Sequence, residues 1–154
     1  MELNRRTLLA TAALAALVGL AGPVQAGPQQ EVKSMVARAI VLYDEKSNAA
    51  LKTFDEGKAS GYLHGDVYIV VQSRGPSAEV LAHAADPSLV GTPLSKIVDP
   101  TGKLFGVEMS KDATEEGKWF DYEWPDPSTG QIGHKRSWAV LHKGFVFIAG
   151  FYVR

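Results

Sequence analysis

Aromatic and acidic residues alternate over positions 119 to 124, a spacing that places the two kinds of side chain on opposite faces of a strand. The two sets are Phe120, Tyr122 and Trp124 on one face, and Trp119, Asp121 and Glu123 on the other. Pro125 and Pro127 end the strand, because proline cannot donate a ladder hydrogen bond. Lys135 then stands just before the point where we expect the next strand to begin. Aromatic walls with a cation near the rim favour binding of a small molecule over catalysis.

Each candidate residue also has a purely structural interpretation, and the sequence leaves both interpretations open. Lys135 either neutralises a ligand carboxylate as a point charge or is a solvated surface lysine. Tyr122 and Trp124 either line a pocket or belong to the core, and Tyr68 on an earlier strand is open in the same way. His83 either donates to a ligand and responds to pH or is a satisfied structural histidine.

The residue types of an enzyme or a metal site are present without the spacing that lets them act together. Asp121 and Glu123 lie two apart on one strand face, where carboxylates are usually solubilising charges. No H-x-E or H-E-x-x-H pattern occurs, and neither do G-x-S-x-G, a P-loop or a dinucleotide fingerprint. We therefore predict a protein that is not an enzyme and that needs no cofactor or metal. The alternative is a small periplasmic enzyme that uses Asp121, Glu123 or His83.

The first 26 residues have the pattern of a targeting segment. Arg5 and Arg6 form a basic region, residues 8–21 are apolar but short for a membrane span, and Val24-Gln25-Ala26 is a small-x-small cleavage site. We predict a signal peptide over residues 1–26 and a periplasmic mature protein that begins at Gly27. Because the arginine pair partly matches a twin-arginine signal, both Sec and Tat export stay open. The alternative is an uncleaved N-terminal anchor.

The mature chain predicted in this way, residues 27–154, has the size of one domain. It carries 14 Lys and Arg against 16 Asp and Glu, so its net charge is −2 with neutral histidines. Without a basic surplus, nucleic-acid binding has no support. The sequence contains no cysteine, which excludes disulfides, thiol catalysis and thiolate metal sites.

Apolar residues recur at intervals of three and four from position 32 to position 54, the pattern of one face of an amphipathic helix. The stripe consists of Val32, Met35, Val36, Ala39, Ile40, Tyr43, Ala50, Leu51 and Phe54, with Ser47 as one small polar residue within it. We predict a single long helix from about Gln30 to about Glu56, closed by Gly57. We expect this helix to cover a sheet.

Five segments have the composition or the alternation of strands, namely 67–71, 79–83, 119–124, 136–142 and 145–153. Turn residues at 74–76 and 143–144 predict two hairpins. Between them, residues 94–98 predict one helical turn, Asp99 to Gly102 a type I turn, and residues 104–116 a short helix. The predicted fold class is α+β, with an antiparallel sheet of about five strands backed by the long N-terminal helix.

The order of these motifs resembles a single Cache domain, the extracytoplasmic PAS-like sensor module of bacterial chemoreceptors and histidine kinases. The most specific piece is Tyr122-Glu123-Trp124-Pro125 followed by Lys135. The other matching segments, which span most of residues 27–154, are Gly61–Val70, His83, Asp86-Pro87 with Gly91, Asp99–Gly102 and Gly150–Tyr152. One departure is Ala84, because the family often has a proline directly after the histidine.

The resemblance implies a PAS-like sheet with a pocket between the sheet and its connecting loops, where many members bind small carboxylates. In such a pocket Lys135 meets the negative charge of the ligand, and Tyr68, His83 and Tyr122 supply hydrogen bonds. The aromatic walls and the adaptable filler are Trp124, Trp138 and Met109. Related domains often dimerise through the long helix, so a homodimer through this helix is also implied.

Sensor domains of this kind usually continue into a transmembrane helix, whereas this sequence ends at Arg154, directly after the last predicted strand. We therefore expect a periplasmic binding or sensing protein for chemotaxis or other signal transduction. It would act with a separate signalling or transport partner, such as a membrane receptor or a histidine kinase. The alternative is an accessory protein–protein interaction module whose pocket is vestigial and filled by its own side chains.

Overall fold

The computed structural model describes residues 27–154, so the predicted signal peptide over 1–26 lies outside the described residues. The helices are α1 (Pro28–Lys46), α2 (Asn48–Asp55) and α3 (Phe105–Asp112), with single 3₁₀ turns at Gly57–Ser60, Pro87–Leu89 and Leu94–Lys96. The strands are β1 (Leu63–His64), β2 (Val67–Gln72), β3 (Val80–His83), β4 (Lys118–Pro125), β5 (Ile132–His142) and β6 (Phe145–Tyr152).

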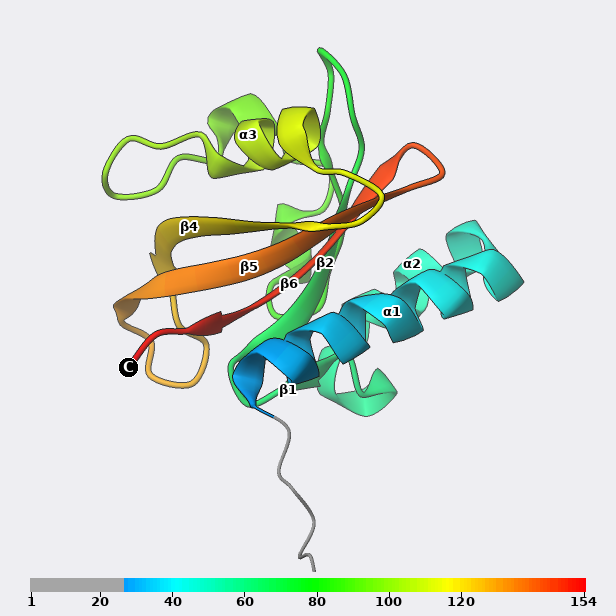
Figure 1. Cartoon of the computed structure of the whole chain (residues 1–154), viewed down its shortest axis with the longest axis horizontal. Helices are drawn as coiled ribbons and strands as arrows, with labels where there is room; N and C mark the ends of the chain where they lie inside the picture. Colours follow the sequence, from blue (N-terminus) through cyan, green and yellow to red (C-terminus); the bar gives the residue numbers. More distant parts are fainter. Residues whose placement is uncertain (1–26) are drawn as a thin grey trace, which may run out of the picture.

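The strands form one antiparallel sheet in the order β1-β2-β6-β5-β4 (Figure 1), with β3 paired to the half of β2 that β1 leaves free. The predicted α+β class and the antiparallel sheet behind an N-terminal helix are confirmed. The predicted turn at Asp99 is also present, because the amide of Gly102 donates to the carbonyl of Asp99 at 2.9 Å. The helical turn near residue 94 and the short helix α3 lie where the sequence placed them.

The predicted single long helix is wrong, because the chain breaks it into two helices at Ser47. This residue has φ 50° in the left-handed region, although its amide still donates to the carbonyl of Tyr43 at 2.7 Å. The break redirects the chain so that α2 packs against β3 as well as against α1. Ala50 and Phe54 stay fully buried, so the apolar periodicity continues through the break and hides it. Gly57, with φ 58°, follows the end of α2, as predicted.

The start of β5 also differs from the prediction. The strand begins at Ile132 rather than at Arg136, and its pairing with β4 runs from Ile132 opposite Pro125 to Ala139 opposite Lys118. Lys135 is therefore inside the sheet, with Tyr122 of β4 on one side and Tyr152 of β6 on the other.

Helices cover both faces of the sheet (Figure 1), and we call them the α1 face and the α3 face. On the α1 face, α1 and α2 bury a core that includes Ile69, Val71, Phe147 and Ala149. On the α3 face, the smaller core around α3 includes Met109, Phe120, Tyr122, Ala139, Val146 and Ile148. α1 lies over β6, β5 and β2, whereas the α1 face of β4 carries exposed charges. Within residues 27–154, no helix combines the length and the apolar character that crossing a membrane requires.

Candidate functional site

A small cavity lies on the α3 face, between the sheet and the segments that cover it. Its walls come from all of β2, β3, β4, β6 and α3 and from two 3₁₀ turns, and consist of Tyr68, Val70, Gln72, Val80, His83, Leu89, Leu94, Ile97, Phe105, Gly106, Met109, Tyr122, Trp124 and Ile148. The free space is about 30 Å³, which admits a water molecule or two and is smaller than an organic ligand. A ligand therefore enters only if part of the wall moves.

Three aromatic rings form one part of the cavity wall. Phe105 at the start of α3 stacks on Tyr122, with ring centroids 4.0 Å apart and planes within 7° of each other. Trp124 meets Phe105 edge-on at 4.9 Å. Phe105 and Trp124 are half-buried, whereas Tyr122 is buried beneath them. We call Phe105, Tyr122 and Trp124 the aromatic cover.

Buried polar groups line the deeper part of the cavity. The side-chain amide of Gln72 donates to the carbonyl of Gly106 at 2.8 Å, which ties β2 to α3. The Tyr122 and Ser137 hydroxyls share a hydrogen bond of 3.0 Å. His83 accepts a hydrogen bond at Nδ1 from the Asp86 amide at 2.9 Å, so its proton is on Nε2 when the ring is neutral.

His83 is neutral near pH 7. Burial lowers the pKa of His83 to about 4, and the positive charge of Lys135 acts in the same direction. The ring stacks obliquely on Tyr68, with centroids 5.1 Å apart. The Nε2–H group of His83 is therefore a neutral hydrogen-bond donor. With a pKa of about 4 the ring is half-protonated near pH 4, so the predicted response of its charge to periplasmic pH is confined to the acid range.

Lys135 is a buried cation on the same face. The residue is 2% exposed, and its Nζ atom lies 3.3 Å from the centre of the Tyr68 ring and 5.1 Å from that of Tyr152. Among residues 27–154, no carboxylate lies within 4.0 Å of this ammonium group. Burial lowers the pKa of Lys135 well below its ordinary value, while Asp66 and Asp126 oppose this shift.

Gly150 leaves room for the lysine to reach Tyr68. Lys135 is on β5 and Tyr68 is on β2, with β6 between them, and Gly150 is the β6 residue directly opposite Tyr68. A side chain at Gly150 would collide with the Ser137 hydroxyl and the Arg136 carbonyl on the β5 side. Because the glycine has none, the lysine side chain and the tyrosine ring meet across the middle strand.

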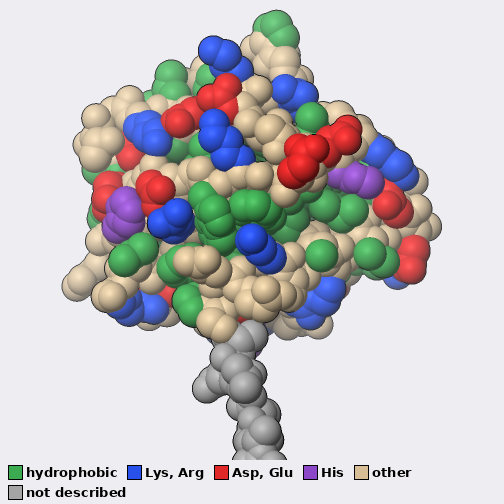
Figure 2. Space-filling model, in the orientation of Figure 1, with side chains coloured by type: hydrophobic (Ala, Val, Ile, Leu, Met, Phe, Trp, Pro, Cys, Tyr) green, Lys and Arg blue, Asp and Glu red, His purple; other side chains and the backbone are tan. Residues whose placement is uncertain are grey.

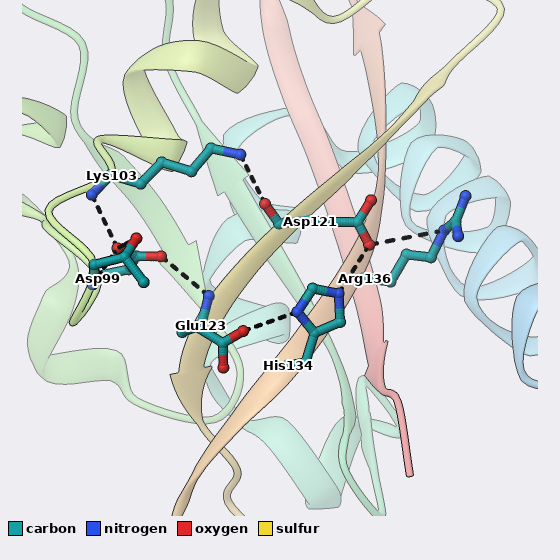
Figure 3. Close-up of polar contacts among 7 residues, drawn as sticks. Asp99, Lys103, Asp121, Glu123, His134 and Arg136 are labelled. Carbon is teal, nitrogen blue, oxygen red and sulfur yellow. Dashed lines mark hydrogen bonds and ion pairs between the residues drawn. The ribbon is translucent and has the colours of Figure 1, made fainter.

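The α1 face of β4 and β5 carries an exposed group of charges, which we call the outer cluster. His134 joins the two acids of β4, with Nδ1 2.8 Å from Glu123 and Nε2 3.3 Å from Asp121, and Arg136 lies 4.0 Å from Asp121 (Figure 3). Side chains of both signs and a histidine gather at the matching edge of the molecule (Figure 2). His134, Asp121 and Glu123 are hydrogen-bonded to one another, whereas Arg136 Nε is 4.0 Å from Asp121 and has no hydrogen-bond partner among the described residues.

The loop before α3 caps the free edge of β4 beside the outer cluster. The amide of Glu123 donates to the Asp99 carboxylate at 3.1 Å, and the Lys103 ammonium donates to the carbonyl of Asp121 at 2.7 Å (Figure 3). Although partial burial raises it, hydrogen bonds from Thr101, Glu123 and Lys103 lower the pKa of Asp99 to about 2. These contacts protect an edge strand from pairing with another chain.

Two other kinds of site have weaker support: an open groove beside α3 and a metal site. A wider groove of about 710 Å³ runs between the β2–β3 turn and α3, but it is open to solvent. Its arginine, Arg74, already donates to the carbonyls of Ser110 and Lys111 at the end of α3. In the described part of the chain, no group of three His, Asp or Glu side chains is arranged to hold a metal ion.

The family model described as "Single Cache domain 2" matches residues 25–153. The chain belongs to the single Cache domain family. No curated protein matches the chain. This Cache domain is similar in structure to a methyl-accepting chemotaxis protein from Vibrio parahaemolyticus RIMD 2210633, with a TM-score of 0.65 and 20% identity over 80% of this chain and 87% of that one.

Two further solved structures have the same fold. The first is described as the periplasmic sensor domain of a chemotaxis protein, with a TM-score of 0.59 and 24% identity over 81% of this chain and 90% of that chain. The second is a Cache chemosensory domain described as recognising a carboxylic acid, with a TM-score of 0.57 and 22% identity over 81% and 88% of the two chains. The TM-scores show a shared fold. Cache domains are extracytoplasmic sensory modules that bind ligands and are not enzymes, which assigns this domain to that class.

The structure brings most of the predicted site residues of this Cache domain together. Five of the seven line the cavity, namely Tyr68, His83, Met109, Tyr122 and Trp124. Lys135 is beside the cavity under Tyr68, but it is buried within β5 rather than placed at a rim. Their contact with a ligand stays a prediction.

The expected position of Trp138 beside the pocket is wrong. Trp138 lies on the α1 face, where its ring is 5.1 Å from that of Trp119 and the Lys33 ammonium lies 4.3 Å from its centre. Lys135 and Trp138 are three residues apart on a regular strand, so they point to opposite faces.

Sequence reasoning missed two residues that shape the site. Gln72 is the polar residue at the end of the apolar strand β2. It lies four residues after Tyr68, so the alternation of a strand places both side chains on the pocket face, and this signal was present in the sequence. Phe105 fitted only a helix pattern. Its place over Tyr122 depends on how α3 packs on the sheet, for which the sequence holds no local signal.

Proposed function

We propose that this Cache domain senses a small organic carboxylate, which binds beneath the aromatic cover on the α3 face. The observation that supports this most is the buried Lys135 ammonium, which has no ion-pair partner among the described residues. Removing an unpaired cation from water is unfavourable, so burial of Lys135 lowers the stability of the unliganded fold. A ligand carboxylate would supply the missing counter-charge, and the Tyr68 ring would hold the ammonium in place meanwhile.

Neutral donors around the lysine suit the same ligand. His83 offers Nε2–H because its Nδ1 atom is occupied by the Asp86 amide, and Tyr122 offers a hydroxyl that now bonds Ser137. Burial raises the pKa of Tyr122, so the phenol keeps its proton and can donate. One cation and two neutral donors match a carboxylate better than an amine, which would face the positive charge of Lys135.

The small free volume limits the ligand and its route of entry. Phe105 and Trp124 are the half-buried members of the aromatic cover, so we expect their side chains to move when a ligand enters. A compact ligand of a few carbons fits this requirement. One structural relative is described as recognising a carboxylic acid, which supports carboxylates as the first class to examine.

The cellular context is part of the same proposal. The sequence pattern of residues 1–26 supports export to the periplasm, and the family supports a position outside the cytoplasm. The domain would pass its signal to a separate membrane receptor, histidine kinase or transport protein, and a homodimer through α1 would be one arrangement for doing so.

A binding experiment with matched variants decides the proposal. Residues 27–154 are titrated with acetate, propionate and lactate, and with propionamide and propylamine as controls of similar shape. A carboxylate at about a hundred times its dissociation constant stabilises the fold by roughly 2.7 kcal/mol, which raises the melting temperature by several degrees. Lys135→Met should abolish the response, whereas Lys111→Met, which changes an exposed lysine, should leave it unchanged.

The second candidate function is an interaction module with a filled pocket, and the cavity volume of about 30 Å³ is the observation that favours it. In that case the domain would unfold cooperatively, yet no carboxylate would shift its melting temperature. Such silence in the wild-type protein would contradict the sensor proposal and favour the interaction module.

A further inference from the structure

Two carboxylates and an arginine meet at the end of the sheet nearest to Lys135. Asp66 precedes β2, Asp126 follows β4, and Arg154 follows β6, with the C-terminus beside the β4–β5 connection (Figure 1). The Arg154 guanidinium bridges the two acids, with one nitrogen 2.9 Å from Asp66 Oδ2 and the other 2.7 Å from Asp126 Oδ2. The carboxylate of Asp126 is 5% exposed and that of Asp66 is 17% exposed, so both need a partner.

The same two acids are the negative charges that act on Lys135. Tyr152 lies directly opposite Lys135 and donates its hydroxyl to the carbonyl of Pro125, the residue before Asp126, at 2.6 Å. Asp66 is two residues before Tyr68, whose ring lies under the lysine ammonium. Both carboxylates oppose the lowering of the lysine pKa by burial, yet neither forms an ion pair with it within 4.0 Å.

Arg154 and Lys135 therefore compete for the same pair of acids, and Arg154 holds them. Asp126 also accepts hydrogen bonds from the amide and the hydroxyl of Ser128, at 2.8 and 2.6 Å. Partial burial raises the pKa of Asp126, but Ser128 and Arg154 outweigh this and lower it, so the group is ionised. The remaining titratable groups that face Lys135 are Tyr68, Tyr122, Tyr152 and the neutral His83, none of which balances its charge.

We infer that Arg154, from outside the cavity, sets the affinity of the site for anions by keeping Asp66 and Asp126 away from Lys135. This inference rests on the proposed function. Arg154 is a positioning residue, because it acts on the ligand through Lys135 and the two acids. Coupling between two sites is reciprocal, so an anion that engages Lys135 also strengthens the hold of Arg154 on the acids.

Four variants distinguish a specific role of Arg154 from a general effect of its charge on anion affinity. They are Arg154→Gln, Arg154→Lys, Asp126→Asn and the double variant Arg154→Gln/Asp126→Asn. In Arg154→Gln the released acids turn to Lys135, so propionate should bind roughly tenfold more weakly. Asp126→Asn should strengthen binding, and the double variant should return towards the wild type. Arg154→Lys keeps the charge but offers a single nitrogen in place of the two that now reach the two carboxylates, so it should lose part of the affinity.

A second measurement follows Lys135 without any ligand. The Lys135 side chain is titrated by NMR in lysine-labelled protein, with Lys135→Met to assign its signals. Arg154→Gln should raise the pKa of Lys135 and Asp126→Asn should lower it further.

An unchanged titration of Lys135 in Arg154→Gln would overturn the inference even in a domain that binds propionate. A wild-type domain that binds none of the carboxylates would instead overturn the proposed function, while the NMR titration still shows whether Arg154 holds the acids away from Lys135.

Discussion

On the α3 face of the β4–β5 hairpin, Lys135 is buried without an ion-pair partner among the described residues. On the α1 face of the same two strands, each charged side chain of the outer cluster has an ion-pair partner within 4.0 Å, although Arg136 Nε makes no hydrogen bond within residues 27–154. His134 there bridges Glu123 and Asp121 within 3.3 Å, and its side chain is 45% exposed. Lys135 and His134 are adjacent in β5, and successive side chains of a strand alternate between faces. One side chain is therefore buried without an ion-pair partner in the described part of the chain, while the other is exposed and paired with two carboxylates.

The contrast separates two uses of charge. Exposed pairs such as those of the outer cluster contribute little to stability, because water screens them and holding long side chains still has an entropic cost. A buried charge without a partner lowers stability more than an exposed pair raises it. A fold that keeps such a group gives up stability at that position, which is common where a protein binds a ligand. The two histidines of the two faces make the contrast measurable.

The largest expected effect is the acid sensitivity conferred by His83. Its folded-state pKa of about 4 is below the unfolded value of 6.5, so the unfolded chain binds the extra proton between these values and stability falls as pH falls. From pH 7 to pH 4 the wild type should lose about 3 kcal/mol through this group. His83→Asn, whose side-chain oxygen can still accept from the Asp86 amide, should lose correspondingly less.

Urea unfolding at several pH values between 4 and 7 measures the difference. His64→Asn serves as the control, because the His64 side chain is 81% exposed and lies outside the cavity. If the free energy of unfolding depends on pH in the same way in the wild type and in His83→Asn, His83 is not buried in its neutral form. That result would contradict the contrast between the two faces.

The next effect concerns Lys135 and the stability of the empty domain. Lys135→Met fills a similar volume without a charge, so the unliganded domain should gain about 2 kcal/mol in free energy of unfolding. Lys111→Met on the exposed side of α3 should change it by no more than about 0.5 kcal/mol. Chemical unfolding of both variants gives the comparison. A less stable Lys135→Met variant would mean that the stacking on Tyr68 outweighs the desolvation of the ammonium.

The sequence predicted the features of this site that depend on local alternation. Tyr122 and Trp124 share a face because strands have a period of two, and Tyr68 and His83 lie on a hairpin whose turn residues are distinctive. The same rule, applied from Lys135, excludes Trp138 from the α3 face. Trp138 was expected in the pocket from the family resemblance, although the alternation of side chains along β5 places it on the opposite face from Lys135.

Features that depend on distant packing were not predictable in this way. Gly133 and His134 are weak strand formers, and β5 extends through them because both pair with β4 and the amide of Val153 donates to the carbonyl of His134 at 2.9 Å. The break at Ser47 leaves the helical stripe intact, so only the packing of α2 on β3 reveals it. The free volume of the cavity depends on the position of Phe105 above Tyr122, which the tertiary fold determines.

The smallest expected effect belongs to His134 in the outer cluster, and it has the opposite sign to that of His83. The hydrogen bond to Glu123 raises the pKa of His134 above 6.5, with Asp121 contributing in the same direction and partial burial opposing it. Its stabilising contribution is therefore complete below pH 6.5 and is lost as pH rises through the folded-state value. His134→Gln should destabilise the domain by about 0.5 kcal/mol at pH 5.5 in low salt, and by less at pH 8 or in 0.5 M salt. Unfolding curves under these conditions test it, and an effect that grows with pH or persists in high salt would show that His134 is not the exposed, paired cation that distinguishes this face from the one that buries Lys135.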